Sequence, residues 1–172
     1  MRKLVVVVDM QNDFIDGALG TKEAVLIVPK VETYLKGIDA DSVDVAFTRD
    51  THYENYLETQ EGKKLPVKHC IEGTPGWEIC DLLMPYAKNC PIFDKPTFGS
   101  TDLMQFAEEQ KYDEIELMGL CTDICVISNA MLLKAALPEA KVVVRKDCCA
   151  GVTPESHDNA LQAMTICQIE IA

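Results

Sequence analysis

The order of apolar and polar residues predicts alternating strands and helices along the chain. Short runs rich in Val, Ile and Leu predict six strands, at residues 4–8, 43–48, 91–93, 115–120, 141–145 and 168–171. Apolar residues at helical spacing predict helices at residues 24–35, 77–84, 102–109, 124–137 and 154–166. This alternation indicates parallel strands joined by crossover helices. We therefore expect one α/β domain over residues 1–172, with three α/β/α layers and a mostly parallel six-stranded sheet.

Two segments carry no such period. Residues 11–21 contain Gly17 and Gly20 and are predicted to form a loop. Residues 51–75 are polar and contain two glycines and two prolines. A loop of this length in a compact domain is usually functional or disordered, which makes this segment a place to look for a binding site.

Composition and charge narrow the class of protein. Hydrophobic residues are 48% of the chain and charged residues 26%, which is ordinary for a globular domain. The net charge of −12 argues against nucleic acid or an anionic membrane as a partner. The first apolar run is too short for a signal peptide or a membrane span, so we expect a cytoplasmic protein. Eight cysteines spread along the chain suit reduced thiols better than disulfides.

Three reactive side chains lie just after predicted strands. Asp9, Lys95 and Cys125 follow the first, third and fourth strands along the chain. Parallel strands would deliver all three to one edge of the sheet, where ligands of open α/β sheets bind. Together they supply a proton acceptor, a charge partner for a thiolate and a nucleophile. Taken singly, each also has a structural explanation, as a turn residue, a solvated charge and a packed thiol.

The position of Cys125 suits a reactive thiol. It falls in the first turn of the helix predicted at residues 124–137, and Thr122 and Asp123 before it are both good N-cap residues. Free N–H groups and the positive end of the helix dipole would favour a thiolate there. For the pair Cys148-Cys149, by contrast, we expect buried structural thiols.

A second group of residues suggests a metal site. Asp50 and His52 follow the second strand, and side chains two apart on an extended segment point to the same side. With His69 from the long loop they would give three ligands and leave positions open for water or substrate. The alternative is a solvated carboxylate and two ordinary loop histidines. His157 shares a helix face with Ala160 and is predicted to be a half-buried packing residue.

Five motifs of the chain resemble those of the isochorismatase-like cysteine hydrolases, most closely the nicotinamidase branch of that family. They occur in the family's order and span nearly the whole chain. They are Asp9-Met10-Gln11-Asn12-Asp13-Phe14, Thr48-Arg49-Asp50-Thr51-His52, His69-Cys70-Ile71-Glu72-Gly73-Thr74-Pro75-Gly76, Lys95, and the segment from Gly119 to Val126. Nicotinamidases often carry a tryptophan before the metal histidine segment to pack the substrate ring, whereas this chain has Leu65-Pro66-Val67-Lys68 before His69.

The resemblance implies a fold, a set of catalytic groups and a reaction. The catalytic groups would be Cys125 as nucleophile, Asp9 as general base and Lys95 as charge partner, on the family's six-stranded sheet. A cis peptide at Leu120-Cys121 would turn the backbone N–H groups of Cys121 and Cys125 towards one point as an oxyanion hole. The reaction would be amide hydrolysis through an acyl-enzyme, converting nicotinamide to nicotinate and ammonia.

The resemblance also implies a cofactor and substrate contacts. A divalent metal ion, zinc first and iron or manganese as alternatives, would be held by Asp50, His52 and His69 and would bind the pyridine nitrogen. Gln11 and Phe14 of the first motif would contact the substrate. Family members are commonly dimers or larger, so a homo-oligomer is expected.

Other functions stay open at this point. An amidase of the same family could act on another small amide, such as a carbamoyl or ureido compound, for which the metal would be unnecessary. The presence of all three candidate metal ligands favours nicotinamide over that substrate class. A non-catalytic metal-binding or thiol redox module is the alternative from another class, and three reactive groups kept at distant positions count against it. Isochorismate ether cleavage is disfavoured, because those relatives lack the cysteine found here at position 125.

Overall fold

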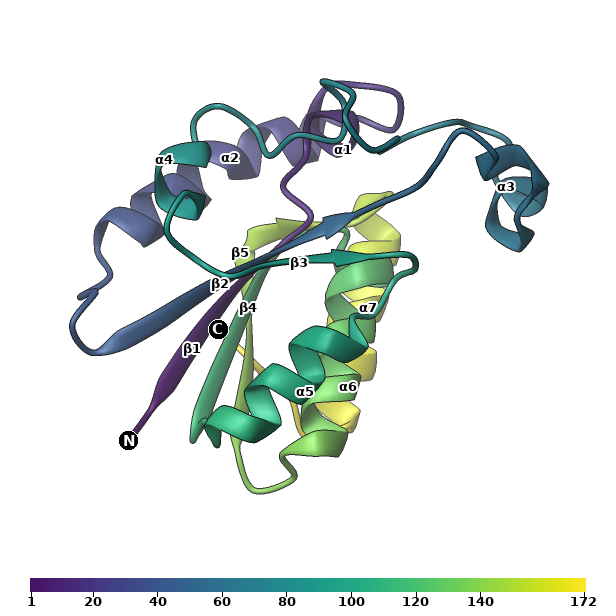
Figure 1. The fold of residues 1–172 in the computed structure, drawn as a ribbon. Coiled ribbons are helices and arrows are strands. Elements are labelled where there is room, and N and C mark those ends of the chain that lie inside the picture. Colours follow the sequence, from purple (N-terminus) through teal and green to yellow (C-terminus); the bar gives the residue numbers. More distant parts are fainter.

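A parallel sheet of six strands forms the middle layer of the molecule (Figure 1). In the computed structural model, which describes residues 1–172, the strand order is β3-β2-β1-β4-β5-β6 and every neighbouring pair is parallel. The strands are β1 (Lys3–Val8), β2 (Val43–Asp50), β3 (Ile92–Lys95), β4 (Glu114–Leu120), β5 (Lys141–Ala150) and β6 (Glu170–Ile171). The predicted α/β fold with a six-stranded sheet is confirmed.

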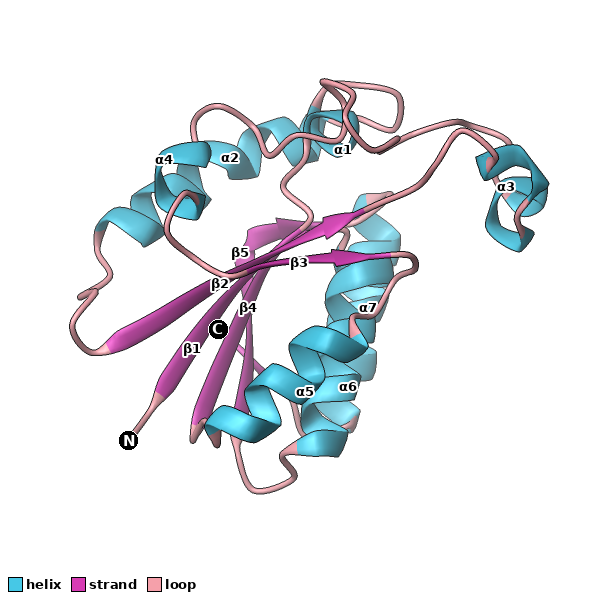
Figure 2. Ribbon diagram, viewed as in Figure 1, coloured by secondary structure: helices cyan, strands magenta, loops and turns pink.

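Helices cover both faces of the sheet (Figure 2). One face carries α1 (Asn12–Ile15), α2 (Lys22–Lys36) and α4 (Met84–Ala87). The other face carries α5 (Thr101–Gln110), α6 (Ile127–Ala136) and α7 (Pro154–Ile166). The short helices η1 (Tyr56–Glu58) and α3 (Gln60–Lys64) project to one side, and the π turn η2 (Thr122–Val126) leads into α6. None of these helices is long and apolar enough to cross a lipid bilayer.

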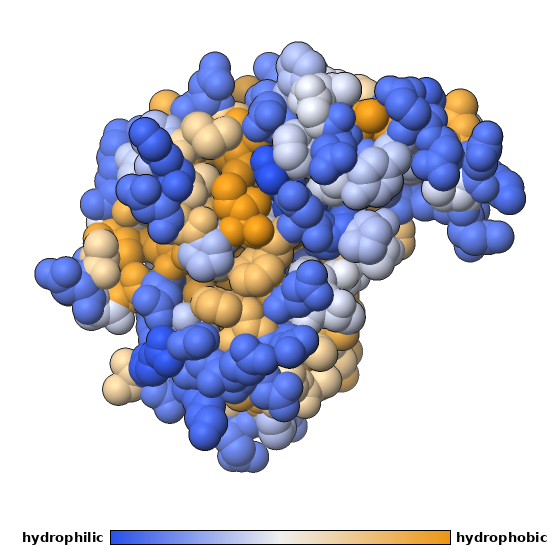
Figure 3. All heavy atoms as spheres, in the orientation of Figure 1, coloured by the Kyte–Doolittle hydropathy of each residue, from blue (hydrophilic) through white to orange (hydrophobic).

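The core follows from the apolar pattern of the sequence. Residues 4–8 of β1 are all fully buried, because β1 is an inner strand with helices on both faces. In α2 the buried residues Ala24, Ile27, Val31 and Leu35 recur at helical spacing and face the sheet. In the view of Figure 3, apolar residues gather between α4 and α5, while hydrophilic residues cover most of the remaining surface.

The prediction of a helix at residues 77–84 is wrong. Most of this segment forms turns, and the helix α4 begins only at Met84. The backbone groups needed for a helix bond instead to the loop after β1, since Cys80 N donates to Met10 O over 3.0 Å and Glu78 O accepts from Asn12 N over 3.0 Å. A long-range pairing thus replaces the local one.

The two segments predicted as loops contain short helices. Residues 11–21 include α1, and residues 51–75 include η1 and α3. Thr59 caps α3, because its side chain accepts a hydrogen bond from Gly62 N over 3.0 Å. The long second segment is therefore ordered and carries a helix out beyond the sheet (Figure 1).

Four neighbouring strands, β3, β2, β1 and β4, end at the same edge of the sheet. Asp50 of β2 pairs in register with Lys95 of β3, and Val8 of β1 pairs with Gly119 of β4. Gly119 has a φ of 121°, and a Cβ there would lie 2.1 Å from the Val8 carbonyl oxygen. Only glycine lets β4 approach β1 this closely before the chain turns towards Cys125.

Candidate active site

Asp9, Lys95 and Cys125 meet at this edge and are all buried. Lys95 Nζ lies 2.6 Å from Asp9 Oδ2 and 3.4 Å from Cys125 Sγ. It also donates to the carbonyl oxygen of Thr97 over 3.1 Å. Thr48 on β2 fixes the second carboxylate oxygen of Asp9, because its hydroxyl donates to Asp9 Oδ1 over 2.6 Å. The three candidate catalytic residues therefore come together from three different strand ends, with Lys95 in contact with the other two.

The charges of these three groups depend on one another. Burial raises the pKa of Asp9 above its ordinary value, although the ammonium of Lys95 opposes this. Burial by itself lowers the pKa of Lys95, but the Asp9 carboxylate and the Cys125 sulfur raise it overall. Burial and the Asp9 carboxylate raise the pKa of the Cys125 thiol well above its ordinary value. The site thus holds a neutral thiol beside a lysine ammonium and a carboxylate of increased basicity.

The turn that carries Cys125 is capped differently from the expectation. The N-cap of η2 is Cys121, without a side-chain hydrogen bond. Thr122 instead bonds to His157, with 2.7 Å between Oγ1 and Nδ1, and Asp123 Oδ1 accepts from Val152 N over 3.2 Å. Both side chains are drawn away from the helix start by partners on α7 and the segment that leads into it. Cys125 does lie in the turn before α6, as predicted.

The peptide bond between Leu120 and Cys121 is cis, as the resemblance implies. Both Cys121 and Cys125 line the same cavity. Burial raises the pKa of the Cys121 thiol to about 12. Of the two thiols, Cys125 is the one in contact with Lys95, with 3.4 Å between Sγ and Nζ, so we assign the nucleophilic role to Cys125 and none to Cys121. Cys148 and Cys149 are buried and His157 is half-buried, in agreement with the packing roles predicted for them.

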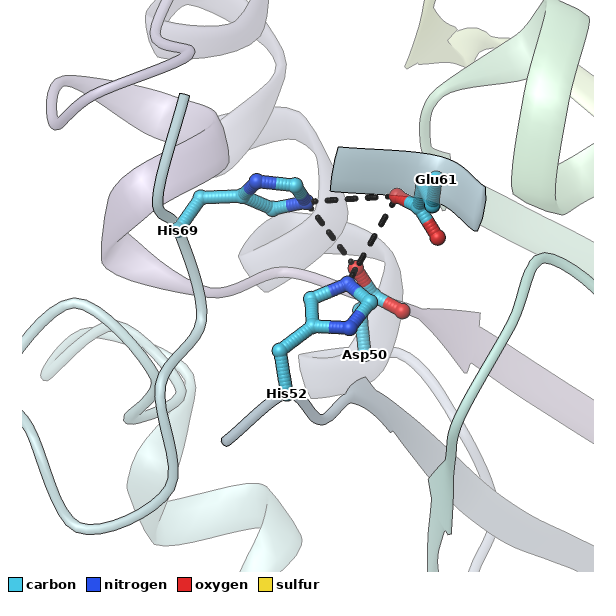
Figure 4. A group of neighbouring side chains, drawn as sticks. All are labelled: Asp50, His52, Glu61 and His69. Carbon is cyan, nitrogen blue, oxygen red and sulfur yellow. Dashed lines mark hydrogen bonds and ion pairs between the residues drawn. The ribbon is translucent and has the colours of Figure 1, made fainter. Parts of the chain in front are cut away.

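Figure 4 shows four side chains that could hold a metal ion, Asp50, His52, Glu61 and His69, called the metal-binding cluster below. The cluster lies beside the catalytic candidates, because Asp50 Oδ1 is 3.6 Å from Lys95 Nζ. The four ligand atoms all lie within 4.8 Å of one another. Asp50 Oδ2 is 2.9 Å from His52 Nε2 and 3.3 Å from His69 Nε2. Glu61 Oε1 is 3.6 Å and 3.7 Å from the same two nitrogens. Three of these ligands, Asp50, His52 and His69, are predicted from the sequence, and the structure brings them together.

The donor set of the cluster fits a divalent transition metal ion. Two imidazole nitrogens and two carboxylate oxygens are ligands that zinc, iron and manganese accept. His69 is oriented from behind, with 2.8 Å between its Nδ1 and the carbonyl oxygen of Val67, so that Nε2 faces the cluster. Burial by itself raises the pKa of Asp50, but hydrogen bonds from His52 and His69 lower it overall, which keeps this carboxylate charged.

Glu61 is the functional candidate that the sequence analysis missed. It lies on α3 within the segment predicted as a loop, between the two histidines in the chain. Its side chain is about four-fifths buried and faces the two imidazoles. The sequence offered one indication, a carboxylate between two candidate metal ligands. It does not show, however, that α3 brings Glu61 next to the two histidines.

Asp50 links the metal-binding cluster to the catalytic candidates. Its Oδ2 faces the two imidazoles, whereas its Oδ1 is buried without a hydrogen bond and lies 3.6 Å from Lys95 Nζ. One carboxylate therefore faces both a cation site and the catalytic lysine candidate. A change at either site changes the electrostatic field at the other.

The structure places Phe14 at the site and Gln11 behind it. Phe14 lines the cavity, and its ring centroid lies 5.5 Å from that of His69. Gln11 is fully buried and is committed to the main chain: Oε1 accepts from Asp50 N over 2.7 Å, and Nε2 donates to Asp50 O and Trp77 O, both over 2.8 Å. In this structure the amide of Gln11 holds Asp50 in place, and the expected substrate contact of Gln11 stays a prediction.

One cavity of about 350 Å³ extends from Cys125 to the metal-binding cluster. Its wall includes Cys125 and Cys121 on one hand, and Asp50, Glu61 and His69 on the other. The rest of the wall is formed by five apolar residues, Phe14, Leu19, Leu65, Phe98 and Ile124, and by the polar residues Gln60, Lys64 and Thr97. The volume and the apolar lining suit a small organic molecule with a few polar atoms. Leu65 lies in this wall, in the segment before His69 where the resemblance predicts a tryptophan.

The chain belongs to the isochorismatase family. The model of the isochorismatase domain matches residues 3–171, which confirms the resemblance noted from the motifs. An isochorismatase family protein of Bacillus subtilis is 31% identical over 173 residues, covering 94% of this chain and 93% of that protein. The nicotinamidase/pyrazinamidase of Mycobacterium tuberculosis is 26% identical, covering 99% of this chain and 98% of that protein.

A solved structure shares the fold over the full length. The pyrazinamidase of Pyrococcus horikoshii in complex with zinc superposes with a TM-score of 0.86 at 28% identity, covering 100% of this chain and 99% of that chain. Relatives of this chain thus bear the names nicotinamidase and pyrazinamidase, and one of them has been crystallised with zinc.

Proposed function

We propose that this protein hydrolyses the amide bond of nicotinamide, giving nicotinate and ammonia. The observation that carries the proposal is the single cavity whose wall contains both Cys125 and three residues of the metal-binding cluster, Asp50, Glu61 and His69. A neutral aromatic amide with a ring nitrogen has one group for each: a carboxamide carbon for the thiol and a lone pair for a metal ion. The relatives named nicotinamidase or pyrazinamidase support the same substrate class.

The first half of the reaction forms an acyl-enzyme. Cys125 Sγ attacks the carboxamide carbon while its proton passes to Asp9, whose raised pKa makes it a suitable acceptor. The backbone N–H groups of Cys121 and Cys125 stabilise the negative oxygen of the tetrahedral intermediate. Asp9 then donates the proton to the amide nitrogen, the carbon–nitrogen bond breaks, and ammonia leaves. Lys95, 2.6 Å from Asp9, keeps its positive charge throughout and balances the carboxylate.

The second half restores the thiol. A water molecule replaces ammonia, gives a proton to Asp9 and attacks the thioester carbon. The carbon–sulfur bond breaks, Cys125 regains its proton, and nicotinate leaves. The sum is one amide and one water consumed, and one acid and one ammonia formed.

Asp50, His52, Glu61 and His69 would hold a divalent ion, for which we propose zinc. When bound, this ion would accept the lone pair of the pyridine nitrogen and so orient the ring and withdraw electrons from it. Phe14, Leu65 and Phe98 pack around the ring and exclude water from the carboxamide. Such a metal contact favours nicotinamide over carbamoyl or ureido compounds, which have no ring nitrogen.

The test is ammonia release from nicotinamide by zinc-loaded protein, with three variants measured in parallel. We expect Cys125→Ala to lose activity by at least about a thousandfold, because the nucleophile is gone. His69→Ala should lose about ten- to a hundredfold through weaker metal binding. Cys149→Ala is the matched control, because Cys149 and Cys125 are both 4% exposed, and it should keep its activity.

Two results would change the assignment. If nicotinamide is untouched while iodoacetamide still alkylates Cys125 selectively, the protein is a cysteine hydrolase for another small amide. If Cys125 neither turns over substrate nor reacts with iodoacetamide in folded protein, the catalytic assignment fails and a non-catalytic metal-binding module takes its place.

A further inference from the structure

Asn129 is a fully buried polar side chain to which the mechanism above gives no role. It is one of three buried residues in α6, together with Ala130 and Leu133. Asparagine is a weak helix former, and burying an amide costs free energy unless its donors and acceptor are all bonded. A buried asparagine near the nucleophile therefore calls for a physical reason.

The amide of Asn129 makes three hydrogen bonds that join two elements. Its Nδ2 donates to the carbonyl oxygen of Cys125 over 2.8 Å and to that of Phe98 over 3.2 Å. Its Oδ1 accepts from Ser100 N over 2.9 Å. These partners fix which end of the amide carries oxygen and which carries nitrogen. One side chain thus connects the backbone of the nucleophile to residues 96–100, the segment between β3 and α5.

The same segment determines two features of the site. Its residue Thr97 accepts the hydrogen bond from Lys95 Nζ, over 3.1 Å. Its residue Phe98 lines the cavity. The segment packs tightly on α6 as well, since a Cβ added at Gly99 would lie 2.6 Å from Leu132 Cδ1. Its position relative to α6 therefore decides where the lysine and the aromatic wall stand relative to the thiol.

We propose that Asn129 is a positioning residue that sets Lys95 and Phe98 relative to Cys125. Lys95 is on β3 and Cys125 is on the turn before α6, 30 residues further along the chain, with 3.4 Å between Nζ and Sγ. The three bonds of Asn129 hold the segment after Lys95 against the turn of Cys125. This role rests on the proposed amide hydrolysis, because it concerns the efficiency of that reaction.

The first test replaces Asn129 by leucine, which has a similar volume and removes all three bonds. We expect kcat for nicotinamide to fall about thirtyfold, since a displacement of reacting groups by about 1 Å costs up to a hundredfold. KM should rise by a smaller factor, through the shift of Phe98. Alkylation of Cys125 by iodoacetamide should slow by about fivefold, because the Lys95 ammonium no longer favours the thiolate.

The control is Ser100→Ala. Ser100 caps α5 in the same segment, with its Oγ accepting from Leu103 N over 3.1 Å, and its replacement leaves the Asn129 bonds in place. This variant should lower the melting temperature and leave kcat and the alkylation rate within about twofold of the unmodified protein.

A second variant keeps the proposal testable if Asn129→Leu does not fold. Gly99→Ala places a methyl group 2.6 Å from Leu132 Cδ1 without touching Asn129. The end of the leucine side chain can give way, so the fall in kcat and in alkylation rate should be several times smaller than that of Asn129→Leu. The double variant Gly99→Ala/Leu132→Ala makes room for the new methyl group and should recover most of the loss. Leu132→Ala alone should retain normal turnover.

Two outcomes overturn the proposal. One is an Asn129→Leu protein that melts earlier while its kcat and alkylation rate stay within about twofold of normal, which would make Asn129 a structural residue only. The other is a Gly99→Ala loss that Leu132→Ala does not recover. If unmodified protein does not hydrolyse nicotinamide but the alkylation rates still differ as expected, the proposed substrate fails and the role of Asn129 stands.

Discussion

Gln11 illustrates how one side chain can shape a site that it does not touch. Its amide bonds both the N–H and the C=O of Asp50, the residue shared by the metal-binding cluster and the catalytic lysine candidate. Its fully buried position removes it from the cavity wall. We therefore expect Gln11 to orient Asp50 as a candidate metal ligand, as partners of metal-binding residues do in general.

Gln11→Leu should therefore weaken zinc binding by about ten- to a hundredfold, measured by competition with a chelating dye. KM for nicotinamide, measured at saturating zinc, should stay within about threefold, because the side chain does not reach the substrate. Gln105→Leu on the exposed face of α5 is the control and should change neither quantity. A large rise in KM with unchanged zinc affinity would instead support a direct substrate contact.

At the scale of secondary-structure elements, a buried ionic cluster away from the active site connects α2 with the strands β1, β4 and β5. Glu116 in β4 is fully buried and accepts hydrogen bonds from Tyr34 of α2 over 2.5 Å and from Arg145 of β5. Lys3 Nζ of β1 lies 2.7 Å from Glu116 Oε2. Burial by itself raises the pKa of Glu116, but the bonds from Lys3, Tyr34 and Arg145 lower it overall. This carboxylate therefore joins α2 to three strands.

We expect Glu116→Gln to reduce the free energy of unfolding by about 2 kcal/mol at pH 7, because it leaves Arg145 without its carboxylate partner and Lys3 with Glu114 alone. The pKa of Glu116 is lower in the folded protein than in the unfolded chain, where it is about 4.3. The stabilisation by the Glu116 carboxylate is therefore complete above the unfolded-state pKa and is lost as the pH falls through the folded-state pKa. Urea unfolding of both proteins should show the difference shrinking below about pH 4. Glu32→Gln, which breaks an i,i+4 pair with the exposed Lys36, should leave the free energy of unfolding almost unchanged. A difference that grows on acidification would contradict this account.

For the molecule as a whole, metal binding is expected to depend on folding. The metal-binding cluster takes Asp50 from β2, His52 and His69 from the long segment, and Glu61 from α3, and only the folded chain brings them within 4.8 Å. An ion that binds the folded state at a hundred times its Kd stabilises by about 2.7 kcal/mol.

Zinc should accordingly raise the melting temperature by about 5–10 °C, since 1 kcal/mol corresponds to about 2–4 °C in a chain of this size. Thermal unfolding followed by circular dichroism, with and without zinc, measures the shift, and EDTA should reverse it. The His69→Ala protein should show little or no shift. An equal shift in that variant would assign the effect to other sites, such as the eight thiols.

The amino-acid sequence alone was sufficient to predict the fold class and most of the candidate site. Apolar periodicity is local and strong, so all six strands and the helices α2, α5, α6 and α7 overlap their predicted ranges, although β5 continues to Ala150, past its predicted end at residue 145. Parallel strands end at one edge, which is why Asp9, Lys95 and Cys125 could be grouped from the order of the elements. The motifs then added the family and gave further support to Asp50, His52 and His69, which their spacing had already suggested as candidate metal ligands.

The partner of each polar group, by contrast, depends on the tertiary structure. Backbone groups at residues 78–80 pair with residues 10–12 instead of forming a helix, Thr122 bonds to His157 instead of capping its own turn, and Glu61 joins two histidines from an unexpected helix. Asn129 reaches a segment about 30 residues earlier in the chain. The physical reason is that hydrogen-bond partners follow no repeating pattern in the sequence. Which groups pair is decided only when packing has brought distant residues together.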